Sequence, residues 1–375
     1  MNHRAPTILL LSLLLTASAN AQVIFGADVG EPGNPQGALF RVNDGTVTAI
    51  QTGLPDPNFP SLSPDGSLLV ISSPDPAQPF EASTDLFAHE LQTGVTRKLV
   101  DNLTQSQDDG SFIFASPLFS ATEVNNQRIA FVNQVSSSHQ DGGGSFRFLN
   151  VIRASNGENL ALAEIGNGNA LDYFQSEFVG VSWSPNAPVF ATPAYVPVVT
   201  NLGRETFAAG IVVFGEGGPG SFVRVGQLTM PSVIDQVPVG IITETHAFPT
   251  FSRNGQRLAF FRITFPDALL TQPVIADLVV IEVATGTGQV VASFNPGEYP
   301  IGVTWSGNDQ LLTFSLGLQV NHSGTYLPLA NPATATLFTV SPNGGPVGSV
   351  PGAPVGYFPN AVPLSRTIFR SNFEG

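Results

Sequence analysis

The sequence predicts an all-β fold, a six-bladed β-propeller of four-stranded antiparallel blades. A strand–turn–strand pattern recurs along the chain at intervals of tens of residues, which indicates a repeat architecture. No stretch after residue 22 shows helical periodicity with caps. The 38 Gly and 31 Pro residues suit a chain with many turns. A closed ring of short sheets accounts for all three features, because it leaves only short edges open.

The clearest copy of the repeat is Phe59–Ser72, which predicts a strand, a tight turn and a second strand. Its corner is Ser-Pro-Asp-Gly. Pro64 sets φ near −65° at the second turn position, Asp65 caps the turn and Gly66 supplies a positive φ. Two further strands follow, at Asp85–Leu91 and Val95–Val100.

Six copies of this unit can be aligned on one position of the turn. The anchors are Ser63, Ser120, Ser184, Ser252, Ser306 and Val362, with steps of 57, 64, 68, 54 and 56 residues. In the unit anchored at Ser252, the third and fourth strands are expected at Asp277–Val283 and Gln289–Ser293. Six anchors predict six blades.

The two chain ends are expected to share one blade. Val23–Ala27, Gly37–Val42 and Thr46–Ile50 match the second, third and fourth strands of later units, and the C-terminal region offers the first strand. Sharing removes an open sheet edge, which otherwise promotes aggregation. Val23–Ala27 and Thr367–Phe369 compete for the second strand, and spacing to the next strand favours the N-terminal segment.

These hairpins, each followed by a Leu/Ile-Ala-Phe type strand, resemble the repeat of TolB-type six-bladed propellers over roughly residues 23 to 370. The resemblance implies the fold. Only one unit carries the full Ser-Pro-Asp-Gly, and the sixth is eroded at Val362. Neither the N-terminal domain of TolB nor a peptidase domain is expected, so the partner-binding role of TolB is not implied.

Residues 1–21 are predicted to be a signal peptide. Arg4 precedes the apolar run Ile8–Leu15, and Ala19-Asn20-Ala21 supplies small residues for cleavage. The propeller is assigned to residues 22–370 and a short tail to residues 371–375. No later stretch is long and apolar enough to span a membrane. A periplasmic or secreted location is expected.

The formal net charge of −14, with no basic stripe, argues against nucleic acid and anionic membranes as partners. Lys98 is the only lysine. The chain has no Cys, which excludes disulfides, thiol catalysis and thiolate metal sites. A monomer that binds a protein or a small polar ligand is expected, and a cation is a possible ligand.

No catalytic motif stands out. Gly180–Ser184 comes nearest to a Gly-x-Ser-x-Gly elbow but belongs to the repeat, and no two His lie at metal-ligand spacing. No cofactor is predicted, and the question of a metal stays open. Trp183 and Trp305 share one repeat position and are expected to pack between blades.

A candidate ligand site lies where the inner strands begin, near the predicted channel mouth. Glu244 and His246 precede Phe248-Pro249 at the entry of the inner strand in the unit anchored at Ser252. Polar or aromatic residues at the same place in other units are Asn58, Asp172, Glu177, Glu298 and Tyr299. Such a ring could bind a cation, a sugar or a peptide, and ordinary loop polarity is the alternative interpretation.

The function that these observations favour is a non-catalytic, exported propeller that serves as a binding or protein-interaction scaffold. The alternative is a propeller enzyme, a lyase or hydrolase acting on a sugar or peptide at the channel mouth. Its catalytic groups would converge from separate blades, which spacing in the sequence does not reveal.

Overall fold

The computed structural model describes residues 23–28, 37–43, 45–63, 66–77, 85–101, 112–114, 119–121, 128–137, 144–166, 181–218, 221–236, 240–266, 272–321, 328–353 and 356–361. Every regular element in these ranges is a β-strand. The predicted signal peptide, the predicted tail and Thr367–Phe369 lie outside them.

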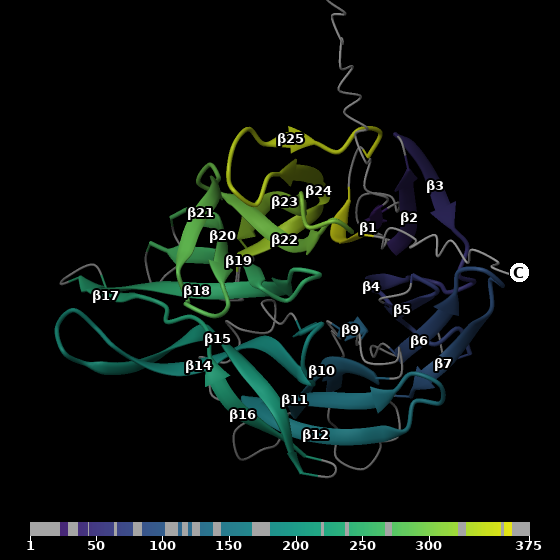
Figure 1. Cartoon of the computed structure of the whole chain (residues 1–375), viewed down its shortest axis with the longest axis horizontal. Coiled ribbons are helices and arrows are strands. Elements are labelled where there is room, and N and C mark those ends of the chain that lie inside the picture. The colour runs from purple at the N-terminus through teal and green to yellow at the C-terminus, as the bar shows by residue number, and fades with distance from the viewer. Residues whose placement is uncertain are drawn as a thin grey trace, which may run out of the picture.

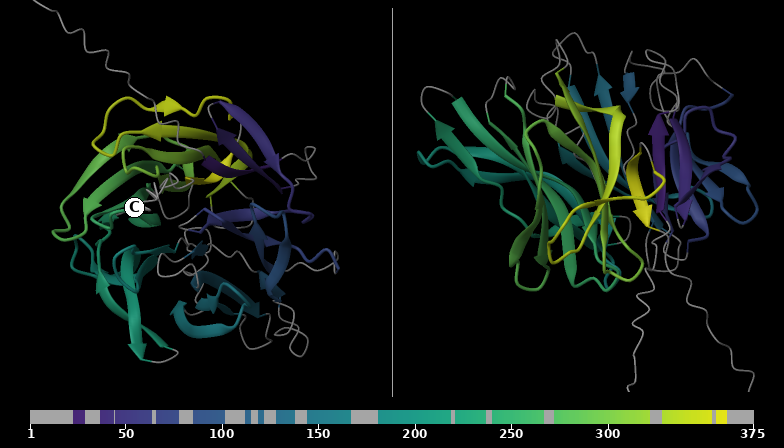
Figure 2. Two further views of the ribbon diagram at one scale, coloured as in Figure 1. Left: turned by 45° about the vertical axis from the view of Figure 1, so that its right-hand side comes forward. Right: turned by 90° about the horizontal axis from the view of Figure 1, so that it is seen from above.

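The strands form six antiparallel sheets arranged around a common centre (Figures 1 and 2), which confirms the predicted six-bladed propeller. Four sheets have four strands and two have five. Blade 1 contains β26 (Tyr357–Ala361), β1 (Val23–Asp28), β2 (Gly37–Asn43) and β3 (Thr46–Ile50). Blade 2 contains β4 (Asn58–Leu62), β5 (Leu68–Ser73), β6 (Asp85–Glu90) and β7 (Thr96–Val100). Blade 3 contains β8 (Phe112–Phe114), β9 (Phe119–Ala121), β10 (Arg128–Ser137), β11 (Gly144–Arg153) and β12 (Asn159–Gly166).

The remaining blades follow in chain order. Blade 4 contains β13 (Ser182–Trp183), β14 (Val189–Val199), β15 (Glu205–Gly218) and β16 (Ser221–Gln227). Blade 5 contains β17 (Val233–Gln236), β18 (Gly240–Phe251), β19 (Arg257–Phe265), β20 (Ile275–Glu282) and β21 (Gly288–Ser293). Blade 6 contains β22 (Glu298–Trp305), β23 (Leu312–Asn321), β24 (Pro328–Val340) and β25 (Gly348–Ser349).

Ring closure occurs in blade 1, where the sheet order is β26-β1-β2-β3. The last described strand therefore pairs with the first, and Val23 lies opposite Ala361. Because β1 occupies the position between β26 and β2, the N-terminal segment is the second strand, as its spacing predicts.

The inner strands share a kink. In blades 2 and 5, Phe59 and Phe248 adopt positive φ angles of 49° and 53°, which non-glycine residues rarely do. The strand register shifts at both places and at the matching place in blade 6, where Gly302 has a φ of 141°. Each bulge bends the inner strand and re-aims the side chains that precede it.

The serine of each repeat turn has a structural role. In blades 2, 5 and 6, its side-chain oxygen accepts a hydrogen bond from the amide five residues later, as Ser252 does from Arg257 at 2.9 Å. Turns of successive blades are also joined. Asn186 donates to the carbonyl of Asn254, and the Asp309 carboxylate accepts from the amides of Arg253 and Asn254. We call the side of the ring that carries these turns the turn face.

Aromatic and aliphatic side chains fill the space between neighbouring sheets. Phe261 of blade 5 lies 6.1 Å from Phe314 of blade 6, measured between ring centroids, and both are fully buried. Trp183 and Trp305 are buried, at 5% and 2% exposure. Trp305 contacts Thr250 and Arg257 of blade 5, whereas the ring contacts of Trp183 are with Phe190 and Phe222 of its own blade. Removing this apolar surface from water is the main stabilisation of the ring.

Blade 5 has a strand that the four-strand repeat does not include. β17 pairs with the start of β18. The neighbouring β14–β15 hairpin is long, and its tip lies with β17 at the left-hand edge of Figure 1. Asn201 in that tip bonds both the amide and the carbonyl of Asp235, so the two extensions support each other.

Candidate functional site

Five of the seven predicted ligand-site residues fall within the described ranges, and Asp172 and Glu177 lie outside them. Asn58 begins β4 and pairs with Ser72. Glu298 begins β22, where its carboxylate accepts hydrogen bonds from the backbone and side chain of Asn295. Tyr299 is buried at 3% exposure.

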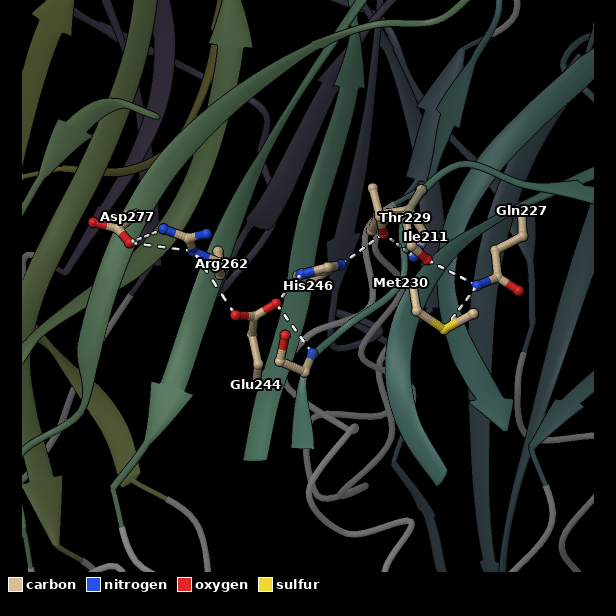
Figure 3. A network of polar contacts seen from close by, with 9 residues as sticks. Ile211, Gln227, Thr229, Met230, Glu244, His246, Arg262 and Asp277 are labelled. Atoms are coloured by element: carbon tan, nitrogen blue, oxygen red, sulfur yellow. Dashed lines mark hydrogen bonds and ion pairs between the residues drawn. The ribbon is translucent and has the colours of Figure 1, made fainter. Parts of the chain in front are cut away.

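Glu244 and His246 are brought together with a third residue that the sequence did not indicate (Figure 3). Both lie on β18, two residues apart, so their side chains share one face of the sheet. His246 Nε2 lies 2.8 Å from Glu244 Oε1, and His246 Nδ1 lies 2.6 Å from Thr229 Oγ1. The three side chains form a continuous polar chain between blades 4 and 5.

The carboxylate oxygens of Glu244 accept hydrogen bonds, so His246 Nε2 is the donor in that contact. Thr229 Oγ1 accepts a hydrogen bond from the amide of Ile211 at 2.8 Å and also contacts His246 Nδ1. Both ring nitrogens are therefore satisfied within the protein.

The same polar chain continues through an arginine on β19 (Figure 3). Arg262 Nη2 and Nε both contact Asp277 Oδ2, at 2.7 and 3.2 Å, and Nε lies 4.0 Å from Glu244 Oε2. Ser293 donates to the other Asp277 oxygen at 2.6 Å. The guanidinium thus lies between two carboxylates, one on either neighbouring strand.

The order Thr229, His246, Glu244 is that of an activated nucleophile, its base and an orienting carboxylate. Its surroundings are not those of a nucleophile that meets a substrate. Thr229 and His246 are 9% and 4% exposed, and the His246 ring packs 4.9 Å from that of Phe260. Geometry and burial favour a role in joining blade 4 to blade 5.

A second charged cluster lies in blade 2. Lys98 Nζ contacts Asp75 Oδ2 at 2.6 Å and Asp85 Oδ2 at 2.7 Å, with Asp101 at 3.8 Å. Burial alone would lower the pKa of Lys98, but its hydrogen bonds to Asp75 and Asp85 raise that pKa above its usual range. The same bond to Lys98 lowers the pKa of the Asp75 carboxyl.

Sequence reasoning missed both cation–carboxylate clusters, although one signal was present. Asp85 on β6 and Asp277 on β20 each precede a leucine, and each meets a cation. The cation comes from β7 in blade 2 and from β19 in blade 5, so no fixed spacing in the sequence marks it.

The two faces of the ring differ in their exposed apolar side chains. We use the name hairpin face for the side of the ring at which the strands β14, β19 and β23 end. Of twelve exposed large apolar residues within the described ranges, seven lie towards this face, whereas the others lie on outer strands or their turns. The seven are Val199, Leu202, Phe207, Met230, Ile234, Ile275 and Leu318. An apolar cluster on one side of a protein is typical of an interaction surface.

Comparison with solved structures places the fold. The crystal structure of TolB from Acinetobacter baumannii matches 92% of this chain and 67% of its own, with a TM-score of 0.52 and 13% identity. The chain has a TolB-like propeller fold. At this identity the likeness establishes the fold alone.

Two further matches are weaker. A putative TolB from Agrobacterium tumefaciens covers 92% of this chain and 98% of its own, at 10% identity and a TM-score of 0.47. An oligogalacturonate lyase in complex with manganese covers 84% of the TolB-like chain and 70% of its own, at 10% identity and a TM-score of 0.43. No protein-family model and no curated protein matches the sequence.

Within the described ranges, no three or more His, Asp or Glu side chains are grouped so that they could hold a metal ion. No helix long and apolar enough to cross a membrane occurs in the same ranges.

Proposed function

We propose that this TolB-like propeller is an exported, non-catalytic scaffold that binds a protein partner through its hairpin face. The observation that carries the proposal is the one-sided distribution of exposed apolar side chains. Phe207, Val199 and Leu202 are 64%, 66% and 54% exposed and cluster at the β14–β15 tip. Of the residues expected to bind a ligand, Glu244 and His246 hydrogen-bond each other, and His246 also contacts Thr229.

The chemistry of the surface indicates the kind of partner. The chain carries a formal net charge of −14, and exposed Glu205 adjoins the apolar tip. A partner with an apolar centre and basic residues at its rim would match both properties. Export follows from the predicted signal peptide at residues 1–21.

The test is a comparison of two double variants in affinity capture from an envelope extract, followed by direct binding of each purified candidate. Leu202→Ser with Phe207→Ser alters the hairpin face, and Val223→Ser with Val225→Ser alters the outer strand β16 as a matched control. We expect one protein to bind the wild type and the control and to be lost from the first variant. Equal binding to all three would contradict the proposal.

The competing candidate is an enzyme, a lyase or hydrolase on a sugar or peptide, in which Thr229, His246 and Glu244 act together. The observation that favours it is the arrangement of the three side chains, in which His246 contacts Thr229 on one side and Glu244 on the other. A screen of sugar and peptide substrates distinguishes the two. Turnover by the wild type that Thr229→Val abolishes, with the fold retained by circular dichroism, would support the enzyme and contradict the scaffold.

A further inference from the structure

We propose that the β14–β15 hairpin binds a proline-rich segment of the partner, with a basic residue next to the prolines, through the face that carries Tyr195 and Phe207. The inference rests on the proposed function and names the class of segment that the hairpin holds. It follows from the arrangement of the two rings, from the state of both hairpin edges, and from the charge beside the rings.

Two aromatic side chains lie on one face of the hairpin. Tyr195 on β14 and Phe207 on β15 have ring centroids 6.5 Å apart, with the ring planes at 80°. Phe207 is 64% exposed and Tyr195 is half-buried. Pro197, directly opposite Phe207, and Val199 are also exposed on this face. We use the name aromatic face for Tyr195, Pro197, Val199 and Phe207.

The aromatic face is held in place from behind and at its tip. Val196, Val198 and Ala208, on the opposite face of the hairpin, are all buried. At the tip, Asn201 bonds both the amide and the carbonyl of Asp235. A surface that is fixed before binding loses little conformational entropy when a ligand arrives.

Neither edge of this hairpin is suited to receive another strand. Residues 228–235 run along the outer edge of β15, bonded to Ile211 at one end and to Asn201 at the other. On β14, Pro193 and Pro197 have no amide hydrogen to donate, and proline on an edge strand prevents pairing. A bound segment is therefore recognised through side chains and not through backbone pairing.

A polyproline II segment meets these conditions. It is extended, has no internal hydrogen bonds and needs no neighbouring strand, because water solvates its backbone. Such segments dock on aromatic side chains, and their stiff backbone limits the entropy lost on binding. Rings held nearly perpendicular offer a proline ring one face and one edge. A sugar would need hydrogen-bond partners for its hydroxyls, whereas the neighbours Pro197 and Val199 are apolar.

The charge beside the aromatic face determines the residue that flanks the prolines. Glu205 is exposed and lies opposite Val199, at the tip end of the face. The adjacent Arg204 pairs with Asp235, with Nε 3.1 Å from Oδ2, so its positive charge is balanced. The chain as a whole carries a formal net charge of −14. Charge complementarity therefore favours an arginine or lysine opposite Glu205.

The first experiment measures binding of a fluorescein-labelled nonapeptide of prolines with one arginine near its end. By fluorescence anisotropy, we expect saturable binding to the wild type and to Phe207→Tyr, which keeps a ring. Phe207→Leu keeps only apolar bulk and should bind about tenfold more weakly, as the loss of an aromatic contact implies. No binding to the wild type, or equal binding by the two variants, would overturn the inference.

The control variant is Val225→Ser, which changes an exposed apolar residue of β16 outside the aromatic face. We expect it to bind the nonapeptide as the wild type does. Because Phe207 is 64% exposed, its substitutions should leave the fold intact, and thermal melts of each variant check this.

The second experiment tests the charge and the class of ligand. Exchanging the arginine of the nonapeptide for glutamate should weaken binding to the wild type, and Glu205→Gln should reduce that difference. A peptide of alternating threonine and valine with the same arginine is the matched ligand without prolines. Equal affinity for this peptide, or displacement of the nonapeptide by maltohexaose, would overturn the inference.

The outcomes distinguish this inference from the proposed function on which it rests. Capture of a partner that Leu202→Ser with Phe207→Ser abolishes, and that Phe207→Leu retains in full, would overturn recognition by the aromatic face and leave docking at the hairpin face supported. Equal capture by all variants, with the nonapeptide still lost from Phe207→Leu, would contradict the proposed function and support the aromatic face as a peptide site.

Discussion

At the residue scale, the position of a residue in the sequence predicts only some of its side-chain contacts. The sequence placed His246 and Glu244 where the inner strand begins, and they do meet. Thr229 and Arg262 were missed, because they reach the pair from the connection after β16 and from β19. Spacing along one strand reports which side chains share a face, but it does not report what a neighbouring blade contributes.

The two tryptophans provide a prediction at this scale. Trp305 Nε1 donates to the Thr250 carbonyl at 2.9 Å, and Arg257 lies 4.8 Å from the centroid of the Trp305 ring. Trp183 Nε1 is buried without a hydrogen-bond partner among the described residues. We therefore expect Trp305→Phe to lower the free energy of unfolding by about 2 kcal/mol and Trp183→Phe by less.

Urea denaturation of both variants, followed by circular dichroism, measures this difference. The substitutions are chemically identical and occupy the same repeat position, so each is the control for the other. A larger loss of stability in Trp183→Phe would show that ring volume, and not the indole N–H, decides the contribution of these residues.

At the element scale, most strand bounds agree with the predicted ones to within one or two residues. Alternating apolar residues and Gly turns mark them well, as in β3, predicted and observed at Thr46–Ile50. β17 was missed because four residues flanked by a proline-containing segment give no clear alternation. The inner strand of blade 4 is reduced to Ser182–Trp183, although its repeat motif is one of the clearest.

The Lys98 cluster allows a prediction about how strands are held together, because it joins β6 and β7 to the segment after β5. Lys98→Met leaves Asp85, whose side chain is 2% exposed, without its cation. We expect a loss of about 3 kcal/mol in unfolding free energy near neutral pH. Glu158→Gln breaks the exposed pair with Arg153 at 3.0 Å and is the control, with little expected change.

The pH dependence of this loss follows from the two shifted pKa values. The pKa of Asp75 is lowered, so its contribution is complete above its unfolded pKa of about 4 and disappears as the pH falls through the lower folded value. The pKa of Lys98 is raised, so its contribution is complete below about 10. Urea melts should show a constant difference between wild type and Lys98→Met from pH 5 to 9. A difference that changes steadily across this interval would contradict this account.

At the scale of the whole molecule, counting repeats predicted the number of blades, and the unmatched strands at the two ends predicted ring closure. The difference between the two faces was not predictable from the sequence. Phe207 and Phe261 are alike in local pattern, yet one is 64% exposed and the other fully buried, because only Phe261 meets a neighbouring blade.

Ring closure can be tested at Gly26. A Cβ added to Gly26 would lie 2.6 Å from Cε2 of Tyr357 on β26, closer than unstrained contacts allow. We expect Gly26→Ala to destabilise the protein by about 1–3 kcal/mol, because the ring of Tyr357 is displaced from the closing strand. In a Tyr357→Ala background the same substitution should have little further effect. Thermal melts of the single and double variants measure this coupling, and additive losses would contradict it.

The register of the closing strands also determines how the ring responds to mechanical force. Val23 and Ala361 face each other, so tension applied to the segments that lead out of β1 and β26 acts at one end of the pair. Antiparallel strands pulled from the same end separate one hydrogen bond at a time, whereas strands pulled from opposite ends must break all their bonds together. Blade 1 should therefore peel open at low force, while the other five blades keep their strands.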